Sequence, residues 1–371
     1  MKIGIDKIAF YVPNQYLDMT DLALARDVDP DKFHIGLGQD EMAVTLNSED
    51  IISLAANAAD DMLDEQDRQE IDMVIVGTES IIDESKAAAV VLHRLLKVQS
   101  FARSFEIKEA CFGATAGLIM ARNHIEAHPK SKVLILAADI ARYGLNSAGE
   151  PTQGAGAVAM LISASPRILS LKKDNLALTQ DIYDFWRPTA ESFPRVDGKL
   201  SNETYIGSFA QIWQEYKKRT GLDFKDFAAL TFHTPYTKMG KKALLPLTED
   251  SNIFEQYEKA TIYNRRVGNI YAGSLYLNLI SLLENSSSLK VGDRIGLFSY
   301  GSGAVAEFFS GELEEAYKEN LRPKQHQSML NRRKKLTIQE YEDIFKSQEI
   351  SLSTQKFSLK EIKDGVRIYQ E

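Results

Sequence analysis

Short apolar runs alternate with amphipathic segments along this chain of 371 residues. The apolar runs predict strands at 3–10, 73–76, 133–137, 157–162, 228–232, 295–298 and 304–309. Apolar residues at helical spacing predict helices over 51–63, 85–96, 115–127, 203–219 and 272–283. Because strands and helices take turns, the pattern indicates a layered α/β fold.

A pattern rich in glycine and alanine occurs twice. The run GAGAVA at 154–159 returns as GSGAVA at 301–306, and each copy leads into an apolar strand. The copies are too far apart for a solenoid repeat, so they indicate two related halves, with chance recurrence as the alternative. The first copy also matches the GxGxxA fingerprint of dinucleotide binding. That fingerprint must follow a strand and open a helix, whereas a strand follows here, so we exclude nicotinamide and flavin sites.

Composition narrows the class of protein. Hydrophobic residues make up 44% of the chain, enough for the core of one large or two ordinary domains. With 44 basic and 52 acidic residues the net charge is −8, so a nucleic acid is not the expected partner. No signal-like apolar segment follows Met1, and no run reaches the ~18 apolar residues of a membrane span. The basic run at 332–335 is expected to be a solvated turn before another helix.

Cys111 is the only cysteine, which excludes an internal disulfide and fits a reducing cytoplasm. A strand-like run ends just before it, and small residues then open a helical pattern. At a helix N-terminus the free backbone N–H groups favour a thiolate and can hold an oxyanion. We therefore consider Cys111 a candidate acyl-carrying nucleophile; the alternative is a small buried hydrophobic residue.

Glu79 follows the buried strand predicted at 73–76, which ends at Gly77. Ligands bind at the carboxyl ends of strands in open α/β sheets. A carboxylate placed there among apolar residues can have a raised pKa and act as a general acid or base. The alternative is a Glu that merely begins a loop.

His233 stands where the strand predicted at 228–232 ends, and three lysines follow it closely at 238, 241 and 242. No histidine is spaced from a carboxylate or thiolate as a metal site requires. A histidine beside lysines on an acidic protein suggests that the lysines hold a polyphosphate ligand at the mouth of the site. A strand-end histidine and a solvated basic face are the alternatives.

Together these segments resemble the 3-hydroxy-3-methylglutaryl-CoA synthase family. The likeness is carried by EACFGATAG at 109–117, GTES at 77–80 and HTPYTK at 233–238. Further matches are ADIARYG at 138–144, EPTQGAGAVA at 150–159, VDGKLS at 196–201, RVGNIYAGSL at 266–275 and YGSGAVAE at 300–307. The resemblance covers essentially the whole chain and is strongest to the short bacterial form of the mevalonate pathway.

The resemblance implies a thiolase-like five-layer αβαβα fold built from two similar βα halves, normally as a homodimer. We place the halves at residues 1–166, with Glu79 and Cys111, and 167–371, with His233 and Asn269. It also implies an acyltransferase that condenses acetyl-CoA with acetoacetyl-CoA, without a metal or other cofactor. Cys111 would carry the acetyl group, Glu79 would remove a methyl proton, and His233, assisted by Asn269, would bind the acetoacetyl carbonyl.

Binding residues follow from the matched motifs. Ser302 with Cys111 would form the backbone oxyanion pocket, and the segment at 33–38 would lie along the CoA tunnel. The remaining substrate-binding positions implied by the resemblance are Asp29, Tyr143, Thr152, Ser201, Lys238, Lys241 and Lys242. One departure is Phe112, at a position where the family often has tyrosine, so a hydroxyl contact is absent there.

Three other functions compete with this one. An initiating 3-ketoacyl synthase shares the fold, Cys111, His233 and Asn269, but its decarboxylative chemistry needs no base at Glu79. A thiolase usually has a second catalytic cysteine, and this chain has one. A non-enzymatic scaffold with Cys111 as a redox-sensing thiol leaves Glu79 and the lysines unexplained.

Overall fold

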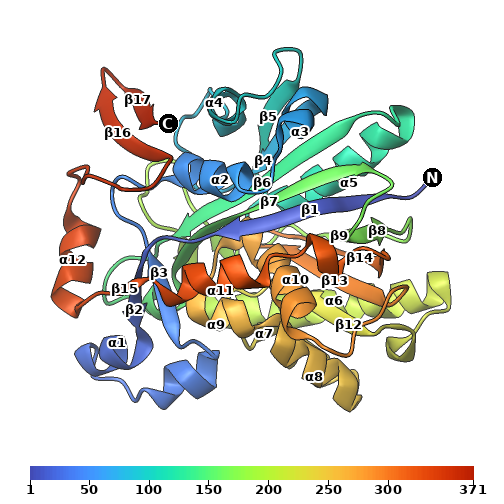
Figure 1. The fold of residues 1–371 in the computed structure, drawn as a ribbon. Helices are drawn as coiled ribbons and strands as arrows, with labels where there is room; N and C mark the ends of the chain where they lie inside the picture. Colours follow the sequence, from blue (N-terminus) through green and yellow to red (C-terminus); the bar gives the residue numbers. More distant parts are fainter.

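A ten-stranded mixed sheet runs through the computed structural model, which describes all of residues 1–371 (Figure 1). Nine of its strands lie side by side in the order β12, β13, β14, β8, β1, β7, β6, β4, β5. The tenth strand, β9, pairs with β14. Their bounds are β1 (Ile3–Tyr11), β4 (Ile71–Gly77), β5 (Arg103–Ile107), β6 (Lys132–Ala141), β7 (Gly154–Ala164), β8 (Leu169–Leu171), β9 (Leu176–Thr179), β12 (Ala229–Phe232), β13 (Arg294–Gly301) and β14 (Val305–Leu313). The central strands are buried on both faces, which is why they appear in the sequence as continuous apolar runs.

Five helices build most of the layers that pack on the sheet. α2 (Ile51–Asp60) and α4 (Ala88–Leu95) pack together on the N-terminal strands, and α6 (Gly198–Thr220) packs on β9 and β14. α5 (Gly113–Ala127) and α10 (Ser274–Asn285) lie in the interior, where the hydroxyls of Thr115 and Tyr276 form a hydrogen bond of 2.8 Å. None of the helices has both the length and the apolar character needed to cross a membrane.

Shorter elements connect these layers at the periphery. The remaining helices are α1 (Met19–Ala25), α3 (Glu65–Glu70), α7 (Met239–Leu244), α8 (Ser251–Ala260), α9 (Ile262–Val267), α11 (Pro323–Asn331) and α12 (Ile338–Lys346). Three small sheets consist of β2 (Gln15–Asp18), β3 (Glu41–Val44) and β15 (Lys334–Lys335); β10 (Phe185–Trp186) and β11 (Arg195–Val196); and β16 (Ser358–Lys363) and β17 (Val366–Gln370).

The two ends of the large sheet repeat one strand pattern. β4 and β6 are parallel, and β7 and β1 then follow antiparallel; β12, β13, β14 and β8 repeat this sequence of directions. The two Gly-Ala runs occupy equivalent places, one opening β7 and the other forming the turn from β13 into β14. The division at residue 166 stays a prediction, because β8 pairs with both β1 and β14 and one sheet crosses it.

The basic run at 332–335 differs from its prediction. A helix, α12, does follow it, and Arg332, Lys334 and Lys335 are exposed as expected, but the run is more than a solvated turn. Lys334 and Lys335 form β15 alongside β2, and the Arg333 side chain is buried, where it donates hydrogen bonds to Glu41 and to the carbonyl of Arg266. The charge of Glu41, which follows from the fold and not from the local pattern, makes this burial possible.

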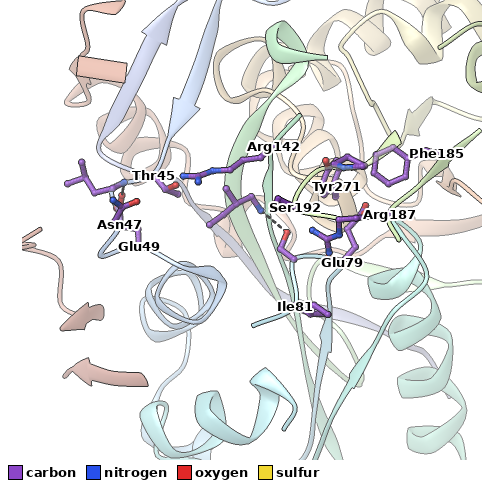
Figure 2. Close-up of a pocket in the computed structure, with 14 residues that line it drawn as sticks. Thr45, Asn47, Glu49, Glu79, Ile81, Arg142, Phe185, Arg187, Ser192 and Tyr271 are labelled. Atoms are coloured by element: carbon purple, nitrogen blue, oxygen red, sulfur yellow. Dashed lines mark hydrogen bonds between the residues drawn. The ribbon is translucent and has the colours of Figure 1, made fainter. Parts of the chain in front are cut away.

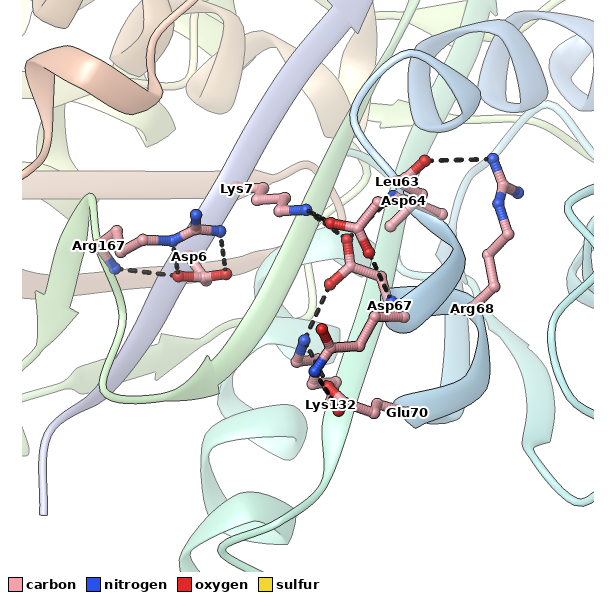
Figure 3. Close-up of polar contacts among 10 residues, drawn as sticks. Asp6, Lys7, Leu63, Asp64, Asp67, Arg68, Glu70, Lys132 and Arg167 are labelled. Carbon is pink, nitrogen blue, oxygen red and sulfur yellow. Dashed lines mark hydrogen bonds and ion pairs between the residues drawn. The ribbon is translucent and has the colours of Figure 1, made fainter.

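A buried carboxylate ties three elements at one end of the sheet, as Figure 3 shows. Asp67 on α3 is 2% exposed and accepts Lys7 Nζ of β1 at 2.5 Å and Lys132 Nζ of β6 at 2.9 Å. Asp64 shares Lys7 at 2.8 Å, and Glu70 shares Lys132 at 2.7 Å. Two ammonium groups therefore depend on one desolvated carboxylate.

Removing that carboxylate should destabilise the fold. We expect Asp67→Ala to lower the free energy of unfolding by about 3 kcal/mol, because both lysines lose a partner in a partly buried site. Urea unfolding at constant protein concentration measures the change. The control is Glu70→Ala, which removes a 40% exposed partner of Lys132 and should cost less than about 1 kcal/mol. Equal losses in the two variants would contradict the argument.

Candidate active site

The turn that carries Cys111 is pressed between two glycines, one from each end of the sheet. A Cβ on Gly77, at the end of β4, would lie 2.3 Å from the backbone nitrogen of Ala114. A Cβ on Gly301, at the end of β13, would lie 2.7 Å from the carbonyl oxygen of Glu109. Backbone segments come this close only where a side chain is absent. Cys111 thus sits where two strand ends converge, two residues before α5 begins.

Glu79 is held in place by a buried aspartate on the neighbouring strand. Asp139 of β6 is fully buried, and its Oδ1 accepts hydrogen bonds from the backbone N–H groups of Glu79 and Ser80, both at 3.0 Å. The same oxygen accepts the Thr78 hydroxyl at 2.8 Å, while Oδ2 accepts the N–H of Ala272 at 3.1 Å. One carboxylate therefore joins the exit of β4 to the segment that opens α10.

The thiol and the carboxyl contact each other. Cys111 Sγ donates to Glu79 Oε1 at 3.4 Å. Burial, helped by the charge of Asp139, raises the pKa of Glu79 to about 8. Burial, together with the charges of Glu79 and Asp139, also raises the pKa of Cys111 well above its usual range. The expectation that the helix end favours a thiolate is therefore wrong, because desolvation and two nearby carboxylates outweigh the helix N-terminus.

His233 enters the site directly after β12 and is 2% exposed. Its N–H donates to the Phe298 carbonyl at 2.8 Å, and its carbonyl accepts the Tyr205 hydroxyl at 2.6 Å, so its backbone is fixed from two elements. The imidazole Nδ1 is buried without a hydrogen-bond partner. Burial lowers the pKa of His233 to about 3, so the ring is neutral and can offer a ligand an N–H donor but not a positive charge.

Asn269 faces the site with a defined orientation. Its Oδ1 accepts the backbone N–H of Tyr271 at 2.9 Å and the hydroxyl of Ser274 at 3.0 Å. Because the amide oxygen is occupied twice, the NH2 group is the part left to donate to a ligand. Gly268 precedes it with a φ of 89°, a backbone conformation that favours glycine.

One cavity of about 270 Å³ gathers most of the predicted site. An aromatic wall of Tyr143, Phe185 and Tyr271 borders it, with ring centroids 5.9 to 6.4 Å apart. Leu37, from the segment predicted along the CoA tunnel, also lines it. The predicted residues on its wall are Cys111, Tyr143, Thr152, Ser201, His233, Asn269 and Ser302.

Two residues that line the first cavity have backbone N–H groups without a protein acceptor. Neither the N–H of Cys111 nor that of Ser302 donates to another protein group. The turn that carries Ser302 is fixed by Asp184, which is buried and accepts the Gly303 N–H at 3.0 Å and the Tyr300 hydroxyl at 2.9 Å. Free N–H donors on a rigid turn are what an oxyanion site requires.

A second cavity, of about 280 Å³, lies beside Glu79, as Figure 2 shows. Glu79 lines this second cavity and not the one that holds Cys111 and His233, whereas Phe185 and Tyr271 line both. Arg187 also lies on its wall, and its guanidinium donates to the Glu79 carbonyl oxygen at 2.5 Å. Glu79 therefore lies between the two cavities: it lines the second and contacts Cys111, which lines the first.

The predicted phosphate-binding lysines lie outside the first cavity. Lys241 Nζ pairs with Glu258 at 2.6 Å, and Lys238 packs its side chain near Gly38. Lys242 is the one whose ammonium group contacts the wall: its Nζ donates to the hydroxyl of Tyr236, a lining residue, at 3.0 Å. Asp29 is exposed and does not line the cavity.

Sequence reasoning missed the residues that organise the site. Asp139 and Asp184 were not singled out, although Asp139 is a lone acidic residue in an apolar stretch, a signal of a buried functional carboxylate, and Asp184 stands among aromatic residues. Phe185 and Arg187 gave no signal, because only the fold brings their segment to the cavity, and Tyr271 lay within the matched run at 266–275 without being assigned a role. No group of three His, Cys, Asp or Glu side chains is arranged to hold a metal.

A thiol able to carry an acyl group, beside a carboxylate and carbonyl-binding donors, characterises a condensing acyltransferase of the thiolase-like class. Comparison with known proteins agrees. The hydroxymethylglutaryl-coenzyme A synthase N-terminal family model matches residues 1–166, and the C-terminal model matches 175–256 and 247–367. The chain therefore belongs to the hydroxymethylglutaryl-CoA synthase family.

Individual relatives cover the full length. The hydroxymethylglutaryl-CoA synthase of Enterococcus faecalis is 63% identical over 100% of both chains. A structure of an HMG-CoA synthase complexed with CoA superposes with a TM-score of 0.98 at 45% identity, covering 100% of both chains. MvaS in complex with 3-hydroxy-3-methylglutaryl coenzyme A gives 0.91 at 36% identity, covering 100% of this chain and 99% of that one. These matches confirm the predicted family, the thiolase-like fold and the acyltransferase reaction of the mevalonate route.

The raised pKa of Cys111 gives a testable prediction. The test is simple because Cys111 is the only thiol in the chain. Glu79→Gln removes a neighbouring charge, so the pKa of Cys111 should fall and alkylation by iodoacetamide should be faster than in the natural protein above about pH 8, where Glu79 ionises. Intact-mass measurement of the alkylation rate against pH reports the change. A slower rate in the variant would show instead that Glu79 activates the thiol.

Proposed function

We propose that Cys111 and Glu79 divide the reaction between them. The Cys111 sulfur attacks the thioester carbonyl of acetyl-CoA, CoA leaves with the thiol proton, and an acetyl thioester remains on the protein. A thioester keeps the methyl protons acidic, so Glu79 removes one of them. The observation that carries this proposal is the 3.4 Å contact between Cys111 Sγ and Glu79 Oε1, which places the base beside the position of the acetyl group.

The second substrate is proposed to be acetoacetyl-CoA. The carbanion formed on the acetyl group attacks the ketone carbon, which forms the new C–C bond and a tertiary alkoxide. The proton that Glu79 removed from the methyl group is returned to this alkoxide, which gives the 3-hydroxyl group and restores the base. The neutral His233 ring and the Asn269 NH2 group donate hydrogen bonds to the acetoacetyl oxygen. The N–H groups of Cys111 and Ser302 hold the thioester oxygen during enolisation. Water then cleaves the bond to Cys111 and releases 3-hydroxy-3-methylglutaryl-CoA.

Every group in this scheme comes from the chain, the CoA thioesters or water, so we propose that no metal or other cofactor takes part. Tyr143, Thr152 and Ser201 would border the acyl groups from the cavity wall. We also propose that the enzyme acts in the cytoplasm, where a reducing environment keeps its nucleophilic thiol free.

The partner of the chain is proposed to be a second copy of itself. β5 forms an edge of the large sheet, so one side of its backbone has no strand partner. Apolar side chains are exposed on the elements around it: Phe101 is 96% exposed just before β5, and Val90 on α4 and Met120 on α5 are about half as exposed. A strand edge beside exposed apolar side chains supports a homodimer that buries this region.

Glu79→Gln tests the proposed division of roles. Acetylation of Cys111 by acetyl-CoA should persist, because the amide cannot raise the pKa of the thiol as the carboxylate does. Condensation should fall on the order of 10²–10⁴-fold, because the amide accepts no proton. Intact-mass detection of acetyl-enzyme and consumption of acetoacetyl-CoA are measured in the same variant.

Cys111→Ala is the control and should show no acetylation at all. Equal loss of acetylation and condensation in Glu79→Gln would make Glu79 structural. Loss of neither would refute its role as the base and favour a decarboxylating synthase.

Lys242→Gln tests the proposed contact with CoA. Lys242 lies over the Tyr236 ring at 4.8 Å and is the cation joined to the cavity wall, so its loss should raise KM for the CoA substrates more than it lowers kcat. Steady-state kinetics with both substrates measures this split. Lys218→Gln on the exposed face of α6 is the charge-matched control and should change neither. A collapsed kcat at unchanged KM would place Lys242 in the chemistry.

A further inference from the structure

Glu79 is fixed at three points by three separate segments. Asp139 of β6 accepts its backbone N–H at 3.0 Å, and the Cys111 thiol donates to its carboxyl Oε1 at 3.4 Å. The third point is its carbonyl oxygen, which accepts Arg187 Nη2 at 2.5 Å. Arg187 follows β10 in the C-terminal half of the chain, so this contact reaches across the sequence to a residue of the N-terminal half. Without the hydrogen bond from Arg187, the carbonyl oxygen of Glu79 has no partner.

The charge of Arg187 matters because the other groups around Glu79 are mostly acidic or neutral. Asp139 on β6 and Glu109 before Cys111 both raise the pKa of Glu79, whereas Arg187 lowers it. The hydroxyls of Tyr143 and Tyr271 and the thiol of Cys111 are neutral at physiological pH. The cavities that Glu79 lines contribute the further charged groups Glu49, Lys108, Arg142 and Asp181.

Figure 2 distinguishes the two arginines of the second cavity. Arg187 lies against Glu79, whereas Arg142 extends toward Thr45 and Glu49 at the other end. Arg187 also lines a further cavity that Glu79 borders, together with Lys108 and Glu109. It therefore stands at the solvent side of Glu79, opposite the cavity in which Cys111 and His233 bind the acyl groups.

We propose that Arg187 is a positioning residue for the catalytic base, holding the Glu79 peptide by its carbonyl and keeping a positive charge beside the carboxylate on its solvent side. This inference rests on the proposed role of Glu79 as the base. Removing the charge makes the carboxylate less favourable, so Glu79 would give up its proton only at higher pH. Acetylation of Cys111, which does not use Glu79 as a base, stays as it is.

The experiment compares the pH profile of kcat for condensation in Arg187→Gln and Arg187→Lys, from about pH 6 to about pH 10. The acid limb of this profile is the rise of kcat with pH as Glu79 loses its proton. In Arg187→Gln this limb should shift to higher pH by about one unit, so kcat should fall about tenfold at pH 7 and be unchanged at high pH. Arg187→Lys keeps the charge, so its acid limb should lie close to that of the natural protein. Arg187 is exposed, so neither substitution threatens folding.

Arg195→Gln is the matched control. Arg195 is an exposed arginine that pairs across the same two-stranded sheet with Trp186, next to Arg187, and its side chain binds Glu191. Its loss changes the net charge equally and should leave the acid limb in place. An unmoved limb in Arg187→Gln, or an equal shift in Arg195→Gln, would overturn the proposal.

Acetyl-enzyme formation, measured in the same samples, separates this proposal from the function on which it rests. If Glu79→Gln abolishes condensation but Arg187→Gln leaves the profile unchanged, only the role of Arg187 fails. If Glu79→Gln condenses normally, the base assignment itself fails, whatever Arg187 does. Loss of acetylation in Arg187→Gln would also count against a role confined to the base.

Discussion

The close approach of two strand ends to the turn around Cys111 is the constraint on which the site depends. Gly77 and Gly301 each leave no room for a Cβ, and together they fix the turn between the N-terminal and C-terminal strands. Because Gly77 is followed within two residues by Glu79, and Gly301 directly by Ser302, the same contacts bring the proposed base and the proposed oxyanion donor to the turn that carries the sulfur. Packing of backbone on backbone thus provides the precision that the chemistry requires.

The electrostatics of the site follow from that packing. Two carboxyl groups, a thiol and an imidazole share a region with little water, and burial shifts each of them toward its neutral form. Asp139 alone is surrounded by donors from the backbone and from hydroxyl groups, which oppose this shift. The arrangement has a cost in stability that the large apolar core offsets, as is common where function requires buried ionisable groups.

Much of the fold was predictable because its central strands are buried on both faces. All seven predicted strands and all five predicted helices are present, with ends that differ by a few residues. Glu79, Cys111 and His233 could be proposed as site residues because each stands where an element begins or ends, and such positions are visible in a linear pattern. The segments around Phe185 and Arg187 were not, since two-residue strands have no periodicity and their role depends on contacts with distant residues. The electrostatic state of Cys111 was mispredicted for the same reason: the helix end is local, whereas Asp139 is not.

The three-residue strand β8 has a consequence for how the molecule loses its structure. It pairs with β1 on one side and with β14 on the other, so the sheet has no seam between its two ends. Detaching either end would expose strand backbone to solvent. It would also expose part of the core of 71 buried residues, to which both ends contribute. The topology thus couples the two ends: their strand patterns repeat, but one continuous sheet and one shared core join them, which favours cooperative unfolding.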